Sequence, residues 1–198
     1  MDRNDWDARY AGDELLWSAE PNRFLVEEVS DLPPGRVLDV ACGEGRNAIW
    51  LASRGWRATG VDFSEVGLAK ADRLGRRSGV DVDWVVADLM EWAPDSEAFD
   101  LVIIFYLQLP ADRRRKVYRN MAAGLAPGGT ILVVGHDSDN LARGYGGPQD
   151  PSVLFSTNDV AGDLAGLEIV KAQQVLRTVK TDEGEKTAID ALVRAVRR

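Results

Sequence analysis

Cysteine and histidine are almost absent from this chain, whose 198 residues include one of each. A lone cysteine provides neither a disulfide framework nor a cysteine metal site, which favours a reducing, cytoplasmic location. Positive charge is also scarce, because 24 basic residues face 32 acidic ones and the formal net charge is −8. Binding to a nucleic-acid backbone requires a positive surface, so we expect no nucleic-acid partner.

Long apolar runs are missing as well. No stretch approaches the ~18 uncharged apolar residues that cross a membrane, and the N-terminal sequence MDRNDWDARYAG is too polar for a secretory signal. We therefore expect no membrane partner. The basic runs 113–116 and 194–198 are predicted to be a solvated helix face and a charged tail. A chain of this length buries one core more readily than two, so residues 1–198 are predicted to form a single domain.

Strand-like and helix-like stretches alternate through much of the chain. The strand-like stretches are residues 36–41, 56–62, 82–88, 99–106 and 130–135, separated by helix-like stretches at 45–54, 64–77 and 112–125. This alternation predicts an α/β, Rossmann-like fold, doubly wound around a mostly parallel sheet with helices on both faces. Residues 167–179 and 186–198 predict a C-terminal antiparallel hairpin, which completes a sheet of seven strands.

Four segments of different roles follow from this pattern. They are an N-terminal helical lid at 1–32 with a helix from Pro21 to Leu32, a cofactor-binding core at 36–135, a substrate loop at 136–155, and a C-terminal helix and hairpin at 156–198. In the first segment, Tyr10 and Trp17 are candidates for covering a bound cofactor, because aromatic faces stabilise a cation. Trp6 is expected to pack against the sheet edge instead.

The segment after the fifth predicted strand is polar and rich in glycine and proline. A loop of this length in a compact domain is usually functional or disordered. Its glycines at 144, 146 and 147 would permit movement when a substrate enters. Tyr145, which lies among them, is therefore a candidate substrate-loop residue.

The sequence RVLDVACGEGRNAI at 36–49 contains the glycine pattern of a nucleotide-binding turn. Gly43, Gly45 and Ala48 fit G-x-G-x-x-G/A. Asp62 follows Gly43 by 19 positions, which is the approximate spacing of a carboxylate that binds ribose hydroxyls. Both features occur with NAD and with S-adenosylmethionine, so they predict an adenosine-type cofactor without choosing between the two.

Two further carboxylates favour S-adenosylmethionine. Asp39 in the first predicted strand would repel a pyrophosphate, whereas it can accept hydrogen bonds from an ammonium group and stabilise a nearby sulfonium. Asp88 ends the third predicted strand and suits the exocyclic amine of adenine. A cationic cofactor therefore fits this acidic rim better than a dinucleotide does.

The sequence resembles the class I S-adenosylmethionine-dependent methyltransferases over about residues 20–135. The matching elements are VLDVACGEG, GVDFS, VVADL, FDLVIIF and LAPGGTILVV, in the family's order and at its spacing, with Ala41 where the family often has glycine. GEGRNAIWLASRGW, an early W-x-x-R-Y and FSTNDVAGDLAGLEIV also resemble the tellurite-resistance and thiopurine methyltransferase-like group. That group methylates small, soft nucleophiles on sulfur, selenium or tellurium.

The resemblance implies roles for residues of the first two loops. Gly43 and Gly45 would let the backbone approach the methionine part of the cofactor. Asp39 would face its amino group, directly or through water, and Asp62 would take the ribose hydroxyls.

The resemblance also implies roles at the later strand ends. Phe63 would pack on the adenine, Asp88 and Leu89 would receive its edge, and Phe105 or Tyr106 would lie near the sulfonium. The full set of predicted cofactor-binding residues is Tyr10, Trp17, Asp39, Ala41, Cys42, Gly43, Gly45, Asn47, Asp62, Phe63, Ser64, Ala87, Asp88, Leu89 and Phe105.

His136 and Tyr106 are the catalytic candidates. At the end of the fifth predicted strand, His136 can serve as a base near neutral pH or be a structural residue bonded to backbone. Asp137, Asp139 and Asn140 offer oxygen ligands for Mg²⁺. The acidic third ligand that metal-dependent O-methyltransferases carry after the fourth strand is missing, so we expect solvated loop carboxylates and no metal.

The predicted reaction is transfer of a methyl group from S-adenosylmethionine to a small-molecule acceptor, with a soft S, Se or Te nucleophile or an O nucleophile. FYLQLP after the fourth strand lacks the Asn/Asp-Pro-Pro-Tyr/Phe pattern of enzymes that methylate DNA bases or protein amides. The chain is expected to act as a monomer or homodimer. Two alternatives stay open: a nicotinamide-dependent oxidoreductase, and a protein that binds S-adenosylmethionine without catalysis.

Overall fold

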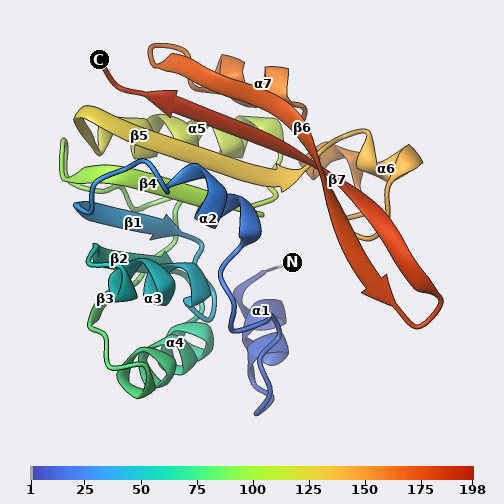
Figure 1. Ribbon diagram of the computed structural model, residues 1–198, viewed down its shortest axis with the longest axis horizontal. Coiled ribbons are helices and arrows are strands. Elements are labelled where there is room, and N and C mark those ends of the chain that lie inside the picture. The colour runs from blue at the N-terminus through green and yellow to red at the C-terminus, as the bar shows by residue number, and fades with distance from the viewer. Residues whose placement is uncertain (1) are drawn as a thin grey trace.

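The computed structural model describes residues 2–198, which build a seven-stranded sheet in the order β3-β2-β1-β4-β5-β7-β6 (Figure 1). The strands are β1 (Arg36–Val40), β2 (Arg57–Asp62), β3 (Val82–Val86), β4 (Phe99–Phe105), β5 (Leu125–His136), β6 (Glu168–Thr181) and β7 (Gly184–Val196). Strands β1 to β5 are parallel, and β7 pairs antiparallel with both β5 and β6. The predicted doubly wound sheet with a C-terminal hairpin is confirmed.

Helices cover both faces of this sheet (Figure 1). They are α1 (Arg3–Tyr10), α2 (Arg23–Glu28), α3 (Arg46–Ser53), α4 (Glu65–Arg77), α5 (Ala111–Ala123), α6 (Asn140–Arg143) and α7 (Thr157–Asp163), with a 3₁₀ turn at Pro151–Val153. Ser64 begins α4 by accepting a hydrogen bond from the Gly67 N–H at 3.0 Å, as its position in the sequence predicts. No helix in residues 2–198 is both long and apolar enough to cross a membrane.

Two hydrophobic clusters lie on opposite faces of the central strands. One packs alternate residues of β1, β4, β5 and β7 against α5 and α7, and the other packs the remaining residues against α2 and α3. The four β4 residues 101–104 have no exposed surface. This agrees with the nearly continuous apolar run FDLVIIF, which is typical of a strand covered on both sides.

Several boundaries differ from the sequence-based prediction. The helix expected at 21–32 is shorter, because Asn22 caps it and it ends at Glu28. The third strand ends at Val86, and the hairpin strands run 168–181 and 184–196 around the predicted turn. The basic run on α5 is not simply a solvated face: Arg114 is buried and pairs with Asp163 at 2.7 Å.

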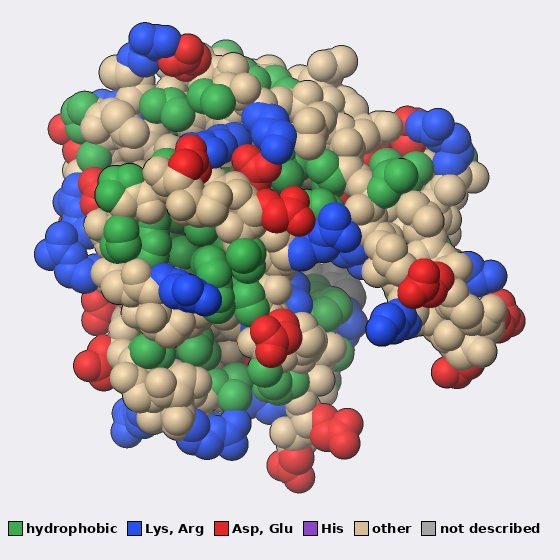
Figure 2. Space-filling view, viewed as in Figure 1, with side chains coloured by type: hydrophobic (Ala, Val, Ile, Leu, Met, Phe, Trp, Pro, Cys, Tyr) green, Lys and Arg blue, Asp and Glu red, His purple; other side chains and the backbone are tan. Residues whose placement is uncertain are grey.

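The β6–β7 hairpin projects beyond the rest of the sheet (Figure 1). Figure 2 shows the molecule hollowed between this projection and the main body, with Lys and Arg side chains at the margins of the recess. The hairpin therefore carries residues of the last two strands past the edge at which the parallel strands end. That edge is where open α/β sheets bind their ligands.

Candidate functional site

The strand order reverses between β1 and β4, so loops from both halves of the sheet diverge at that point. Ligands of open parallel sheets bind at such a point, outside the carboxyl ends of the strands. The predicted loop at 41–45 follows β1 there, and Tyr106 follows β4 beside it. The structure thus brings the predicted glycine loop and the catalytic candidate Tyr106 to the same edge of the sheet.

The loop after β1 depends on left-handed backbone at three positions. Ala41, Gly43 and Gly45 have φ of 56°, 55° and 76°. A Cβ on Gly45 would lie 2.4 Å from the ring of Trp84, so a glycine is required there by close packing as well as by φ. Ala41, in place of the family's frequent glycine, adopts the same strained region despite its Cβ.

Asp39 lies beneath this loop with 2% of its surface exposed. Its carboxylate accepts a hydrogen bond from the Ala48 N–H at 3.1 Å, which ties β1 to the first turn of α3. Burial raises the pKa of Asp39 to about 7, although the Ala48 N–H and the charge of Arg46 oppose the rise. These two partners do not offset the cost of burying the charged carboxylate, and a cation placed beside it would stabilise the charge further.

Asp62 ends β2 and holds two loops in place. Its carboxylate accepts hydrogen bonds from the N–H groups of Gly43 at 2.8 Å and Ser64 at 2.9 Å. Burial raises the pKa of Asp62 despite these bonds. Phe63 is half-buried beside it, and Cys42, also part-buried, donates its backbone N–H to Val61.

The end of β3 forms the far margin of the site. Ala87 donates its N–H to the Asp62 carbonyl, which joins the two loops. Asp88 is exposed and accepts a hydrogen bond from the Met90 N–H at 2.8 Å, while Leu89 is buried. Both predicted adenine-contact residues thus lie next to the loop that Asp62 begins.

The N-terminal segment covers the glycine loop. The Tyr10 hydroxyl oxygen lies 2.6 Å from the point that a Cβ on Gly43 would occupy, and Tyr10 is buried. Trp6 stacks on Tyr10 with ring centroids 5.5 Å apart. Trp17 keeps 44% of its surface exposed.

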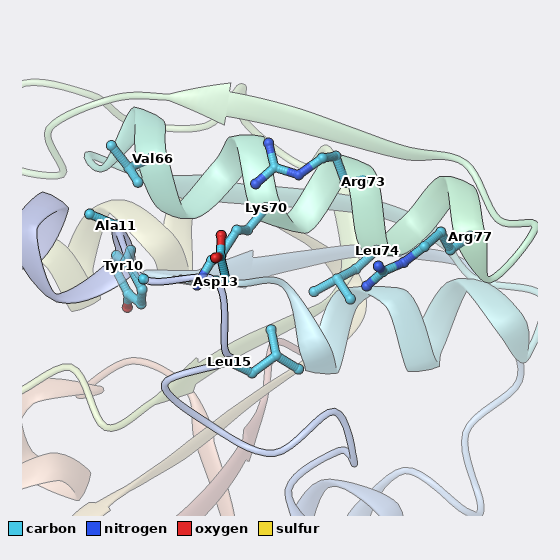
Figure 3. Close-up of a pocket in the computed structure, with 10 residues that line it drawn as sticks. Tyr10, Ala11, Asp13, Leu15, Val66, Lys70, Arg73, Leu74 and Arg77 are labelled. Atoms are coloured by element: carbon cyan, nitrogen blue, oxygen red, sulfur yellow. The ribbon is translucent and has the colours of Figure 1, made fainter.

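A buried ion pair anchors this covering segment, and sequence reasoning missed it. Glu44 and Lys70 are 3.0 Å apart with side chains 4% and 8% exposed. Glu44 also accepts the Leu16 and Trp17 N–H groups, and Lys70 donates to the Glu14 carbonyl. Figure 3 shows Lys70 and Tyr10 bordering a pocket of about 230 Å³ between the segment and α4.

Two predicted cofactor-binding residues have structural partners. Asn47 is buried, and its side-chain oxygen accepts the Asn22 N–H at 2.9 Å, which fixes the start of α2. Phe105 is 8% exposed and packs in the cluster under α2 and α3. Tyr106, the next residue, turns out of the core with φ of 56°.

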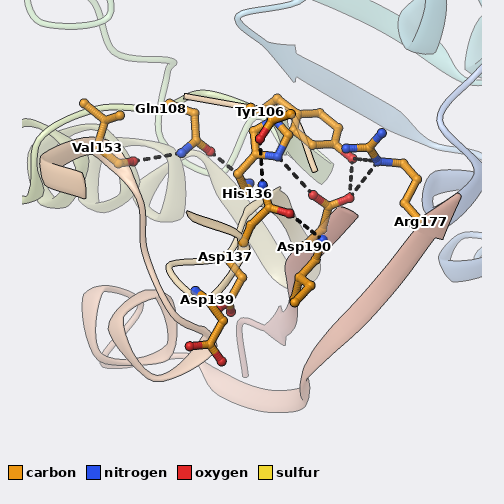
Figure 4. Close-up of polar contacts among 12 residues, drawn as sticks. Tyr106, Gln108, His136, Asp137, Asp139, Val153, Arg177 and Asp190 are labelled. Atoms are coloured by element: carbon orange, nitrogen blue, oxygen red, sulfur yellow. Dashed lines mark hydrogen bonds and ion pairs between the residues drawn. The ribbon is translucent and has the colours of Figure 1, made fainter. Parts of the chain in front are cut away.

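Tyr106 and His136 belong to a polar cluster that includes residues of the C-terminal hairpin (Figure 4). The Tyr106 hydroxyl donates to Asp190 at 2.8 Å, and Arg177 donates to Asp190 at 2.8 Å and to the Tyr106 oxygen at 3.1 Å. His136 Nδ1 lies 3.3 Å from Asp190 Oδ1, and the Tyr106 and His136 rings are 5.0 Å apart. No local pattern in the sequence indicates Asp190 or Arg177, because antiparallel strand pairing places both residues beside Tyr106 and His136.

The predicted substrate loop is pinned at both ends. Asp137 and Phe155 form an isolated β-bridge, and the Asn140 amide bonds Gly146 and Ile189 from inside the loop. The expectation of solvated loop residues is wrong for Asp137 and Asn140, which are 1% and 2% exposed.

The tip of this loop lies over the imidazole. A Cβ on Gly147 would come within 2.9 Å of the His136 ring, so the absence of a side chain permits this approach. Tyr145, two positions earlier, keeps 43% of its surface exposed. An aromatic side chain is thus presented to solvent at the margin of the polar cluster.

A family model described as "Methyltransferase domain" matches residues 37–129, the stretch that carries the glycine loop and the acidic strand ends. Over this stretch the chain is similar to methyltransferase domains, which agrees with the predicted resemblance to the class I S-adenosylmethionine-dependent methyltransferases. The match ends within β5 and does not reach β6, β7 or the N-terminal segment.

Individual methyltransferases match over longer stretches. Glycine N-methyltransferase of Rattus norvegicus is 29% identical over 171 residues, covering 78% of this chain and 58% of the relative. Thiocyanate methyltransferase 1 of Arabidopsis thaliana is 24% identical over 193 residues, covering 94% of this chain and 83% of the relative. The chain spans about half the length of the first relatives it matches, at 58%, 47% and 41%.

Among solved structures, TehB from Haemophilus influenzae superposes with a TM-score of 0.75 and 21% identity, covering 99% of this chain and 67% of TehB. At that identity the likeness shows the fold alone.

The residues of this site fit S-adenosylmethionine. Asp39 is a buried carboxylate whose charge is poorly compensated, and it suits an ammonium group. The side chains missing at Gly43 and Gly45 allow Tyr10 and Trp84 to pack against the backbone of the loop, and both glycines are buried. The donor set is therefore that of a cationic, adenosine-containing ligand rather than of a pyrophosphate.

Proposed function

We propose that this chain transfers a methyl group from S-adenosylmethionine to a small-molecule acceptor. The observation that carries the proposal is the junction of two sets of residues at one sheet edge. Asp39, Gly43 and Asp62 form an acidic, glycine-lined cofactor site after β1 and β2, and Tyr106 and His136 stand next to it after β4 and β5.

The chain's residues would hold the cofactor at three points. Asp62 would bind the ribose hydroxyls, Asp39 would bind the methionine ammonium group, and Asp88 would receive the adenine amine. Arg46, whose charge acts on Asp39, is suited to the methionine carboxylate. Tyr10 already covers the glycine loop, which supports a role in excluding water.

When bound, the cofactor supplies a methyl group on a sulfonium, which is an activated leaving group. The protein then has to align the acceptor and exclude solvent, and alignment of this kind is worth about 7–11 kcal/mol. Tyr106 and the loop that carries Tyr145 and Gly147 would form the acceptor side. The pinned ends of that loop support a defined shape for a small ligand.

The acceptor atom is proposed to be a soft sulfur, selenium or tellurium, or an oxygen. Thiocyanate methyltransferase 1, which matches most of this chain, is named for a sulfur-containing anion. Ubiquinone biosynthesis O-methyltransferase of Marinobacter nauticus, 35% identical over 56% of this chain, is named for an oxygen acceptor. The family match supports methyl transfer rather than the nicotinamide-dependent alternative.

Calorimetric titration with S-adenosylmethionine, S-adenosylhomocysteine and NADPH tests the cofactor. We expect the first two to bind and NADPH not to bind, and the reverse result would refute the proposal. A panel of thiols, thiocyanate, selenite, tellurite and phenols, with detection of S-adenosylhomocysteine, then tests turnover. Cofactor binding without turnover on any acceptor would favour a non-catalytic binding protein.

Asp62→Ala provides the matched site variant. Loss of a hydrogen-bonded, charged group costs about 1.5–3 kcal/mol, so we expect cofactor affinity to fall by roughly 10- to 100-fold. Asp81→Ala, at an exposed position before β3, is the control and should bind as the wild type does. Urea unfolding of both variants separates a lost ligand contact from a lost loop, because Asp62 also holds Gly43 and Ser64.

A further inference from the structure

His136 and Asp190 face each other across the ladder between β5 and β7. They are directly opposed in the antiparallel register, which places their side chains on the same face of the sheet. His136 Nδ1 and Asp190 Oδ1 are 3.3 Å apart, and both atoms are buried without a hydrogen-bond partner in the described structure. Each atom is therefore placed to pair with the other.

The second oxygen of Asp190 is bound by two other donors. Oδ2 accepts from the Tyr106 hydroxyl at 2.8 Å and from Arg177 Nε at 2.8 Å. Burial by itself would raise the pKa of Asp190, but the neighbouring His136 side chain and the hydrogen bond from Arg177 hold it below its ordinary value. Asp190, with no exposed surface, is thus an ionised acceptor between the histidine and the arginine.

We infer that Asp190 positions His136 as the general base for an acceptor that carries a proton on its nucleophilic atom. This inference rests on the proposed methyl transfer. An ionised carboxylate opposite Nδ1 favours the imidazole with its proton on Nδ1, and the lone pair then lies on Nε2. His136 would be the catalytic residue and Asp190 the positioning residue.

The reaction then balances for a neutral thiol, selenol or phenol. The bond between the acceptor atom and the methyl carbon forms as the carbon–sulfur bond of the cofactor breaks, and the electron pair of that bond stays on sulfur. The acceptor's proton passes to Nε2 of His136 and later leaves to solvent. An anion such as thiocyanate has no proton to lose and would not use the base.

Other charged groups face this pair from several elements. Arg177 on β6 and Tyr106 after β4 contact Asp190 directly, and Arg46 at the start of α3 acts electrostatically on both. Beyond the end of β5, the side chain of Gln174 donates hydrogen bonds to Asp137 and Asp139.

The tautomer can be read without any turnover, because His136 is the only histidine in the chain. Nitrogen-15 NMR of the imidazole at a pH where it is neutral should show the proton on Nδ1 in the wild type. In Asp190→Asn the Nε2–H form should increase, since the carboxylate is gone. A wild-type ring protonated on Nε2 would overturn the inference, whether or not the variant folds.

Arg177→Gln is the matched control for this measurement. It removes the other ion-pair partner of Asp190 and leaves the carboxylate opposite His136, so the Nδ1–H form should persist. An equal change of tautomer in both variants would refute positioning by Asp190. Urea unfolding accompanies each variant, so that a general loss of structure is recognised.

Kinetics then tests the consequence. The ratio of kcat/KM for a neutral phenol or thiol to that for thiocyanate should fall about 100-fold in Asp190→Asn, since a general base contributes roughly that factor or more. An unchanged ratio in a variant that still turns over would refute the role of Asp190 and would not contradict the proposed methyl transfer. Failure of the wild type to bind S-adenosylmethionine would refute the proposed function instead.

Discussion

Replacing Asp39 by Asn should stabilise this protein above neutral pH and weaken its affinity for the cofactor. Asp39 is 2% exposed, and its hydrogen bond from the Ala48 N–H can be kept by the amide oxygen of Asn. The substitution therefore removes a charge with little change of shape. The variant therefore separates the effect of the buried carboxylate on the stability of the fold from its effect on cofactor affinity.

The magnitude follows from the proton affinity of Asp39. Burial raises its pKa from 3.8 to about 7. Each tenfold change in proton affinity corresponds to about 1.4 kcal/mol, so the charged form costs the folded state about 4 kcal/mol at pH 8. Because the folded protein holds the proton more tightly, wild-type stability falls as the pH rises from about 4 through 7. Asp39→Asn lacks this dependence.

Urea unfolding at pH 5, 6.5 and 8 without cofactor measures the effect. The stability gap between Asp39→Asn and the wild type should widen by about 2–3 kcal/mol between pH 5 and pH 8. Asp81→Asn, at an exposed position, is the control and should follow the wild type. Calorimetry at pH 8 should show at least a tenfold loss of S-adenosylmethionine affinity in Asp39→Asn, because an ion-pair partner is missing.

Two results would refute this reasoning. A stability gap that does not change with pH would mean that Asp39 is no uncompensated buried carboxylate. Unchanged cofactor affinity with the expected gain in stability would confirm the buried charge and remove Asp39 from the binding site.

Two other substitutions test the closed form of the site. Lys70→Met leaves the buried Glu44 carboxylate without its cation and should lower the free energy of unfolding in urea by about 3–5 kcal/mol. The double variant with Glu44→Gln should recover part of this loss. A Lys70→Met protein as stable as the wild type would contradict the prediction. Gly147→Ala places a Cβ 2.9 Å from the His136 ring, at a backbone φ of 77°. It should lower the free energy of unfolding by about 1–3 kcal/mol and reduce turnover. Wild-type stability together with wild-type turnover would show that the loop does not rest on the imidazole.

Local signals in the sequence predicted most of the parallel sheet. The apolar run of β4, the cap at Ser64 and the glycines at 43 and 45 each predict a short piece of local structure, and each prediction is confirmed. The acidic strand ends lie at one edge because parallel strands all end on the same side. Predicting the position of these acidic residues therefore required only the order of the strands and helices along the chain.

Burial of charged residues could not be predicted in this way. Arg114 and Lys70 are spaced like residues of a solvated helix face, yet both are buried against carboxylates from distant segments, Asp163 and Glu44. Asp163 lies 49 positions from Arg114, and Glu44 lies 26 positions from Lys70. Neither pair therefore falls within a single helix or strand. Tertiary packing decides such cases.

The sequence by itself determined the fold class, the cofactor loop and the acidic groups at its margin, because strand periodicity, turn glycines and strand order are local or sequential properties. Only the tertiary structure decided what surrounds His136. Asp190 reaches it through the antiparallel register of β7 between β5 and β6, and Arg177 joins from β6. A shift of one residue in that pairing would turn Asp190 to the other face, and nothing in the local sequence fixes a register between strands so far apart.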